Sequence, residues 1–111
     1  MIRAVLYRED GRFTGFMAQG HSGYAERGHD IVCAGVSILG TTCVNALESQ
    51  LGILAVIRAN KDGLLSFDLP QADGDRAKGA QLLMGALSQG LSDLRAAYPG
   101  YLTFEIKERR K

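Results

Sequence analysis

The sequence predicts an α+β protein of two layers, in which a largely antiparallel sheet carries two helices on one face. Short apolar segments rich in β-branched residues alternate with two long segments whose apolar residues recur every three or four positions. Turns that contain glycine separate neighbouring strand segments, which is typical of antiparallel hairpins. The predicted element order is ββαββαβ, and a chain of 111 residues is expected to form one domain, residues 1–111.

The N-terminal part of the chain predicts a β-hairpin followed by an irregular loop. Residues 2–8 and 12–19 are the two strands, and residues 9–11 form the turn. Glycine at position 11 favours this turn, because glycine tolerates the positive φ that such hairpins require. The loop that follows, residues 20–29, contains several glycines and isolated charges but no hydrophobic period.

A long helix is predicted from Ile31 to about Leu51. Asp30 is the expected N-cap, because its carboxylate can accept hydrogen bonds from N–H groups two or three residues further on. Gly52 is a typical residue at which a helix ends. The apolar stripe of this helix consists of Val32, Val36, Leu39, Cys43, Leu47 and Leu51.

The remainder of the chain predicts three strands and a second helix. The strands cover residues 53–59, 64–69 and 101–107, with a turn over residues 60–63 between the first two. The second helix begins at Asp73 or Asp75 and continues to about residue 98, before the Pro-Gly pair that breaks it.

Charge and composition limit the classes of function that fit this chain. A net charge of +1 gives no general attraction to nucleic acid. The N-terminus lacks the long apolar run of a signal peptide, and no stretch approaches the roughly 20 apolar residues of a membrane span. Two cysteines do not form a disulfide framework. We therefore expect a cytoplasmic protein that binds neither membrane nor nucleic acid directly.

The segment from Gly20 to Ser37 contains both histidines and one of the two cysteines. If Asp30 caps the helix, Cys33 lies in its first turn, where backbone N–H groups and the helix dipole favour a thiolate. A strongly nucleophilic cysteine also needs a cation or a proton acceptor beside it. His21, at the end of a strand, and His29, directly before the cap, are the two candidates.

Two other interpretations of these residues compete with a nucleophile. Cys33 can be a small buried hydrophobic residue with both histidines in solvent, which is how we interpret Cys43 on the apolar stripe. A zinc site formed by His21, His29, Cys33 and Cys43 is disfavoured, because the spacing matches no compact zinc motif and the helix directs the two cysteines to different faces. We therefore predict no metal ion and no cofactor.

The chain carries Gly-His-Ser-Gly at residues 20–23, Gly28, and Asp-Ile-Val-Cys-Ala-Gly-Val-Ser at residues 30–37. This combination resembles the ribosomal-processing cysteine protease family, Prp, and the predicted elements match that family in order over essentially the whole chain. The resemblance implies a cytoplasmic bacterial endopeptidase that removes the N-terminal extension of a large-subunit ribosomal protein. It also implies a homodimer with a mobile loop between the catalytic histidine and cysteine.

The resemblance also implies roles for individual residues. Cys33 corresponds to the nucleophile and His21 to its general base. Ser37 occupies a family position one helical turn from Cys33, where its hydroxyl can bond within the site. Asp30 matches as a helix cap, as a group that orients the histidine, or as both. For the chemistry itself, we expect the N–H of Cys33, alone or with another in the first helical turn, to bind the developing oxyanion, and we expect the loop over residues 22–29 to close over a bound peptide.

The competing function is that of a non-catalytic, ribosome-associated or RNA-binding module. The basic tail at residues 107–111 and the aromatic residues Tyr7, Phe13 and Phe16 of the first hairpin favour it. The near-neutral charge and the lack of a recognisable base-stacking motif speak against it. Aromatic residues on such a hairpin more often belong to the core.

Overall fold

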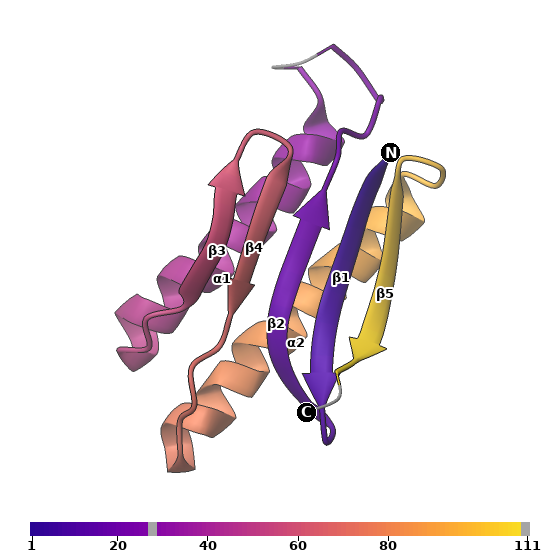
Figure 1. Ribbon diagram of the computed structural model, residues 1–111. Coiled ribbons are helices and arrows are strands. Elements are labelled where there is room, and N and C mark those ends of the chain that lie inside the picture. The colour runs from indigo at the N-terminus through magenta and orange to yellow at the C-terminus, as the bar shows by residue number, and fades with distance from the viewer. Residues whose placement is uncertain (27–28, 110–111) are drawn as a thin grey trace.

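The computed structural model of the chain describes residues 1–26 and 29–109. It confirms the predicted order ββαββαβ, and both helices lie on the same face of one sheet (Figure 1). The strands are β1 (Ile2–Glu9), β2 (Arg12–Gln19), β3 (Val56–Lys61), β4 (Leu64–Asp68) and β5 (Leu102–Glu108). The helices are α1 (Ile31–Leu51) and α2 (Gly74–Ala97).

The sheet has the strand order β3-β4-β2-β1-β5. The β1–β2, β2–β4 and β3–β4 pairs are antiparallel, and only the β1–β5 pair among the described strands is parallel. It follows that β2 and β3 run in the same direction, as do β4 and β5. Strands that run in the same direction need a long connection, and each helix supplies one. The prediction of a largely antiparallel sheet is confirmed.

Strand β3 begins three residues later than the sequence predicts, because the end of α1 uses the residues in between. Gly52 adopts a φ of +66°, and its N–H donates to the carbonyl of Glu48 at 2.8 Å. The N–H of Ile53 donates to the carbonyl of Leu47 at 2.9 Å, and its side chain is buried. The bond from Gly52 is that of an αL C-cap, and the bond from Ile53 holds the next residue against the end of the helix, so residue 53 does not join a strand.

The turn between β3 and β4 is also shorter than predicted. It consists of Asp62 and Gly63 alone, and Gly63 has a φ of +74°. Asn60 and Lys61, expected in the turn, are therefore the last two residues of β3. This shift brings their side chains to the rim of the pocket described below.

The core lies between the sheet and the two helices. Phe16 of β2 and Phe67 of β4 are fully buried, with their ring centroids 5.6 Å apart. The helices approach each other closely at three glycines: an added Cβ on Gly35 would lie 3.2 Å from Leu94, one on Gly90 would lie 2.5 Å from Leu39, and one on Gly79 would lie 2.7 Å from Leu51. Leucines of each helix thus pack onto glycines of the other, and these contacts hold α1 against α2 both in its N-terminal half and at its last residue.

Helix α1 differs from the sequence expectation in one respect. It is long and apolar enough, by length and composition alone, to cross a membrane, with a mean hydropathy of 1.5. The expectation that no stretch approaches such a span is therefore wrong. The core helix of a soluble protein meets the same test, and the buried residues Val32, Val36, Cys43 and Leu47 of α1 belong to the core.

Candidate active site

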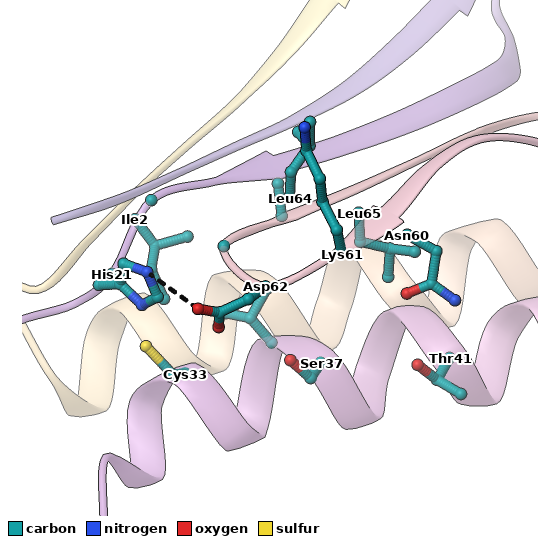
Figure 2. Close-up of a pocket in the computed structure, with 14 residues that line it drawn as sticks. Ile2, His21, Cys33, Ser37, Thr41, Asn60, Lys61, Asp62, Leu64 and Leu65 are labelled. Atoms are coloured by element: carbon teal, nitrogen blue, oxygen red, sulfur yellow. Dashed lines mark ion pairs between the residues drawn. The ribbon is translucent and has the colours of Figure 1, made fainter. Parts of the chain in front are cut away.

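A pocket of about 160 Å³ opens between α1 and the β3–β4 hairpin (Figure 2). Three of the predicted site residues, His21, Cys33 and Ser37, line it. Its wall on the other side consists of residues 60–65, from the end of β3 through the turn to the start of β4. The fold thus gathers the predicted residues from the end of β2 and the first turns of α1 into one solvent-accessible depression.

Cys33 is the third residue of α1 and is half-buried. Its Sγ accepts a hydrogen bond from the backbone N–H of Ser22 at 3.3 Å. Ser37 and Thr41 follow at intervals of four residues, so all three side chains share one side of the helix. They form the helical wall of the pocket (Figure 2). The thiol therefore faces a polar, accessible space and is not part of the closed core.

Asp30 caps α1, as predicted. Its Oδ1 accepts the N–H groups of Val32 and Cys33, both at 3.0 Å, and its Oδ2 accepts the hydroxyl of Ser22. Burial raises the pKa of Asp30, but hydrogen bonds from Ser22 and Cys33 outweigh this and lower the pKa from its ordinary 3.8 to about 2. The carboxylate is therefore ionised at neutral pH, beside the positive end of the helix dipole.

The hydrogen bonds of this N-cap also bear on the expectation that the N–H of Cys33 binds the oxyanion. The N–H of Cys33 is bonded to the Asp30 carboxylate, and the N–H of Ala34 donates to the Asp30 carbonyl at 3.0 Å. An N–H group that is already paired with a carboxylate cannot bind an oxyanion without breaking that bond. The expectation that the N–H of Cys33 is available for this role is therefore wrong in this arrangement.

His21 stands at the end of β2, where backbone contacts fix its position. Gly20, with a φ of +102°, donates its N–H to the carbonyl of Gly63 at 2.8 Å. The ring packs against that turn so closely that an added Cβ on Gly63 would lie 3.0 Å from Nε2. Nε2 is 4.0 Å from Oδ2 of Asp62, and Figure 2 shows the sulfur of Cys33 directed toward the ring. With Nε2 beside Asp62, Nδ1 is the nitrogen left for the thiol.

The second histidine lies apart from the pocket. His29 is exposed, and its backbone N–H donates to the carbonyl of Glu26 at 2.9 Å. It is not among the residues that line the pocket. Of the two candidates from the sequence, the structure brings only His21 to Cys33. The acidic group beside His21 is Asp62, whereas Asp30 bonds to the first turn of α1, to Ser22 and to the side chain of Cys33.

Cys43 is a core residue, as predicted. It is 5% exposed, and its Sγ lies 3.7 Å from the sulfur of Met84 and 3.8 Å from the carbonyl of Leu83. Burial raises the pKa of the Cys43 thiol from 9.0 to about 11. The zinc alternative needed this residue beside the histidines. Within residues 1–26 and 29–109, no group of three or more His, Cys, Asp or Glu is arranged to hold a metal ion.

The start of the loop before α1 is held in place. Ser22 is buried, and the ring of Tyr24 packs edge-on against those of Tyr98 and Tyr101, with centroids 5.3 and 5.2 Å away. The predicted mobile loop covers residues 22–29, of which residues 27 and 28 lie outside the described part of the chain. Closure of this loop over a peptide stays a prediction.

Sequence reasoning missed the wall that the hairpin contributes. Asn60, Lys61 and Asp62 line the pocket, about 30 positions from Cys33 in the chain. The Asp-Gly pair signalled a turn, but no local pattern indicated that this turn meets the end of β2. Ser22 was also missed as a buried polar residue, because nothing in a Gly-His-Ser-Gly run shows where its hydroxyl points.

The comparisons with known proteins agree with this geometry. Residues 1–103 match the family model described as cysteine protease Prp. The ribosomal processing cysteine protease Prp of Bacillus subtilis is 32% identical over 101 residues, which covers 88% of this chain and 90% of that protein.

Solved structures give the same result. The structure of SMU.848 from Streptococcus mutans superposes with a TM-score of 0.83 at 32% identity, covering 98% of this chain and 96% of that one. The ribosomal processing protease Prp of S. aureus, in complex with a covalently linked product peptide, gives a TM-score of 0.86 at 27% identity, covering 96% and 100%. The chain therefore belongs to the Prp family of cysteine proteases and is a cysteine peptidase.

Proposed function

We propose that this peptidase removes the N-terminal extension of a large-subunit ribosomal protein during ribosome assembly. The relatives named as ribosomal processing proteases support a ribosomal substrate. The observation that carries the proposal is the pocket itself, in which the half-buried thiol of Cys33 and the imidazole of His21 share one open, polar depression. A peptide chain that enters this depression meets both groups.

In the proposed reaction, Nδ1 of His21 accepts the proton of the Cys33 thiol, and the thiolate attacks a carbonyl carbon of the substrate. The sulfur–carbon bond forms while the carbonyl electron pair moves to oxygen. When the tetrahedral intermediate collapses, the carbon–nitrogen bond breaks and His21 returns the proton to the leaving amine. The mature protein departs, and the extension stays on Cys33 as a thioester. Water, deprotonated by His21, then releases it.

Three further residues have supporting roles in this proposal. Asp30 holds the first turn of α1 through the N–H groups of Val32 and Cys33, and so fixes the direction of the thiol. Ser37 is exposed on the pocket wall one turn beyond Cys33, where its hydroxyl can bond to a bound peptide (Figure 2). Asp62, near Nε2 of His21, favours the tautomer that carries its proton on Nε2.

We also propose that the enzyme works in the cytoplasm as a homodimer. Large apolar side chains are exposed on both helices and just after α1, and association would remove them from water: Ile38, Leu54 and Leu82. Light scattering at micromolar concentration checks the oligomeric state. A mass of one chain at all concentrations would contradict the dimer and leave the peptidase unaffected.

Direct RNA binding is not part of this proposal. Phe16 is buried and Phe13 packs against the core, as expected for core aromatics. Tyr7 lies on the other face of the sheet, with the guanidinium of Arg109 3.9 Å from its ring centroid. These rings are therefore engaged within the protein. RNA binding that is sensitive to salt and unchanged by Cys33→Ala would favour the alternative function.

Cleavage of the extended ribosomal protein, read by mass spectrometry, tests the function. We expect one defined cut by the wild-type enzyme, no cut by Cys33→Ala, and an unchanged cut by Cys43→Ala. A fully active Cys33→Ala would contradict the proposed nucleophile. A wild-type enzyme that leaves this substrate intact, while its Cys33 reacts with iodoacetamide, would contradict the substrate and not the nucleophile.

A further inference from the structure

Ser22 is the buried polar residue of the loop before α1. Its relative exposure is 5%, and that of its partner Asp30 is 8%; they are the two buried polar or charged residues of the described chain. The hydroxyl of Ser22 donates to the carboxylate of Asp30 and accepts the N–H of Tyr24 at 3.1 Å. Since the bond to Asp30 is buried and the bond from Tyr24 is partly buried, they hold the backbone at residue 22 more firmly than fully exposed bonds would.

The backbone of Ser22 is what these bonds hold in place. Its N–H donates to Sγ of Cys33 at 3.3 Å, across eleven positions of the chain. The N–H groups of Val32, Cys33 and Ala34, in the first turn of α1, are bonded to Asp30 instead. Within the described residues, the Ser22 N–H is thus the backbone donor that reaches the sulfur.

A donor at this place favours the ionised thiol over the neutral one, and so opposes the Asp30 carboxylate, which also bonds to the Cys33 side chain and favours the neutral thiol. A thiolate is a stronger hydrogen-bond acceptor than a thiol, so an N–H that is already directed at the sulfur stabilises the charged form without further reorganisation. His21, which accepts the proton, immediately precedes Ser22 in the chain. The imidazole that accepts the thiol proton and the N–H that stabilises the resulting thiolate therefore belong to adjacent residues.

We propose that Ser22 is a further positioning and charge-supporting residue of this site: its N–H stabilises the Cys33 thiolate, and its hydroxyl, bonded to Asp30, keeps that N–H directed at the sulfur. This inference rests on the proposed role of Cys33 as nucleophile. It assigns one carboxylate two tasks, because Asp30 fixes both the residue that carries the thiol and the residue that carries the donor.

The hydroxyl has a physical reason to matter here. Glycines with φ of +102° and +74° lie on both sides of the His21–Ser22 pair, at positions 20 and 23. Glycine gives a backbone more conformational freedom than any other residue. Without the bond to Asp30, the peptide unit before Ser22 would be free to rotate, and the N–H would lose its direction toward Sγ.

The most direct test removes the donor alone. Chemical synthesis can replace Ser22 by the corresponding α-hydroxy acid, which exchanges its N–H for an ester oxygen and keeps its side chain. The readout is the rate of alkylation of Cys33 by iodoacetamide between pH 5 and 10, with the modified residue identified by peptide mapping. A hydrogen bond to a charged group is worth enough to predict that the rate at pH 7 falls about tenfold or more, with the profile displaced to higher pH.

Two side-chain variants keep the test sharp if the ester weakens folding. Ser22→Ala keeps the N–H and removes its anchor, so we expect a smaller fall of about threefold in the same direction. Ser22→Thr retains a hydroxyl and is expected to restore the wild-type profile. Ser49→Ala, an exposed serine near the end of α1, serves as the matched control and leaves the profile unchanged.

The outcomes separate this inference from the function on which it rests. Identical alkylation profiles for the wild-type, ester and alanine proteins would overturn the role of Ser22, even if cleavage of the ribosomal substrate proceeds. Slower cleavage with an unchanged profile would overturn it too, because that pattern indicates only a structural role. A wild-type Cys33 that reacts no faster than a free cysteine at any pH would overturn both.

Discussion

The two cysteines of α1 lie ten residues apart on one helix in opposite surroundings. Cys33, in the first turn, faces an open polar pocket, with an N–H group at its sulfur and His21 beside it. Cys43 is buried against Met84, and burial raises the pKa of its thiol to about 11. The comparison teaches that the position of a cysteine on the helix, through the neighbours at that position, decides whether its thiol faces an accessible polar pocket or packs in the core.

Among the variants that keep the Cys33 thiol, the largest effect is expected from removing the histidine beside it. General base catalysis typically contributes about 100- to 10,000-fold, so His21→Ala should lower kcat for cleavage by that order. His29→Ala is the matched control, because His29 is exposed and lies outside the pocket; it should leave kcat unchanged. Steady-state cleavage assays measure both. Equal losses in the two variants would mean that His21 has no special place at the thiol.

Chemical modification sharpens the contrast between the thiols themselves. With a pKa of about 11, roughly one Cys43 thiol in a thousand is ionised at pH 8, and the residue is also inaccessible. We expect iodoacetamide to modify Cys33 at least about 100-fold faster than Cys43 in the folded protein. Peptide mapping by mass spectrometry gives both rates. In urea the two rates should become similar, and a difference that survives unfolding would contradict the account.

A smaller effect is expected at the turn that supports His21. A Cβ at residue 63 would lie 3.0 Å from Nε2, so Gly63→Ala should displace the ring and lower kcat about tenfold. Gly11→Ala is a matched control, since Gly11 also has a positive φ in a hairpin turn but has nothing within 4 Å of the added Cβ. Both variants should lose comparable stability in urea denaturation. Similar activity in the two would exclude a contact effect on His21.

The smallest effect concerns stability. Asp30→Asn keeps a side-chain oxygen for the N-cap but removes the negative charge that the hydrogen bonds from Val32, Cys33 and Ser22 stabilise, so it should reduce the free energy of unfolding at pH 7 by about 1 kcal/mol. Because hydrogen bonds from Ser22 and Cys33 outweigh the opposing effect of burial, the pKa of folded Asp30 is about 2, below the ordinary 3.8. The stabilisation is therefore present above pH 4 and is lost as the pH falls toward 2.

Urea denaturation between pH 2 and 7 measures this difference. Asp73→Asn is the control, because Asp73 precedes α2 as its N-cap but makes no side-chain cap bond. It should leave both the stability and its pH dependence unchanged. If wild type and Asp30→Asn lose stability in parallel below pH 4, the cap is not the origin of the acid sensitivity.

The sequence predicted the element order and the buried stripe of α1 because both depend on local periodicity. The sequence predicted the bounds of β3 less well, because these depend on hydrogen bonds at the end of α1 and on the geometry of the β3–β4 turn. The bonds of Gly52 and Ile53 at the end of α1 make β3 start later than predicted, and the short Asp62-Gly63 turn makes it end later than predicted. Neither shift can be predicted from the hydrophobic pattern.

The site shows the same division. Cys33, His21, Asp30 and Ser37 were predicted as site residues from one motif region of the sequence, and their roles stay predictions. The roles of Ser22 and Asp62 depend on contacts over eight to forty-one positions, between Ser22 and Asp30 and between His21 and Asp62. Such contacts become visible only when the end of β2, the start of α1 and the β3–β4 turn are brought together.

The most direct test of the central claim is to trap the covalent intermediate. The extended ribosomal protein is mixed with the enzyme, the reaction is stopped with acid within milliseconds to seconds, and the enzyme is mapped by mass spectrometry. The account predicts that the N-terminal extension is attached as a thioester to Cys33, and that no such adduct forms in Cys33→Ala. An adduct on Cys43, or cleavage by Cys33→Ala at the wild-type rate, would contradict it.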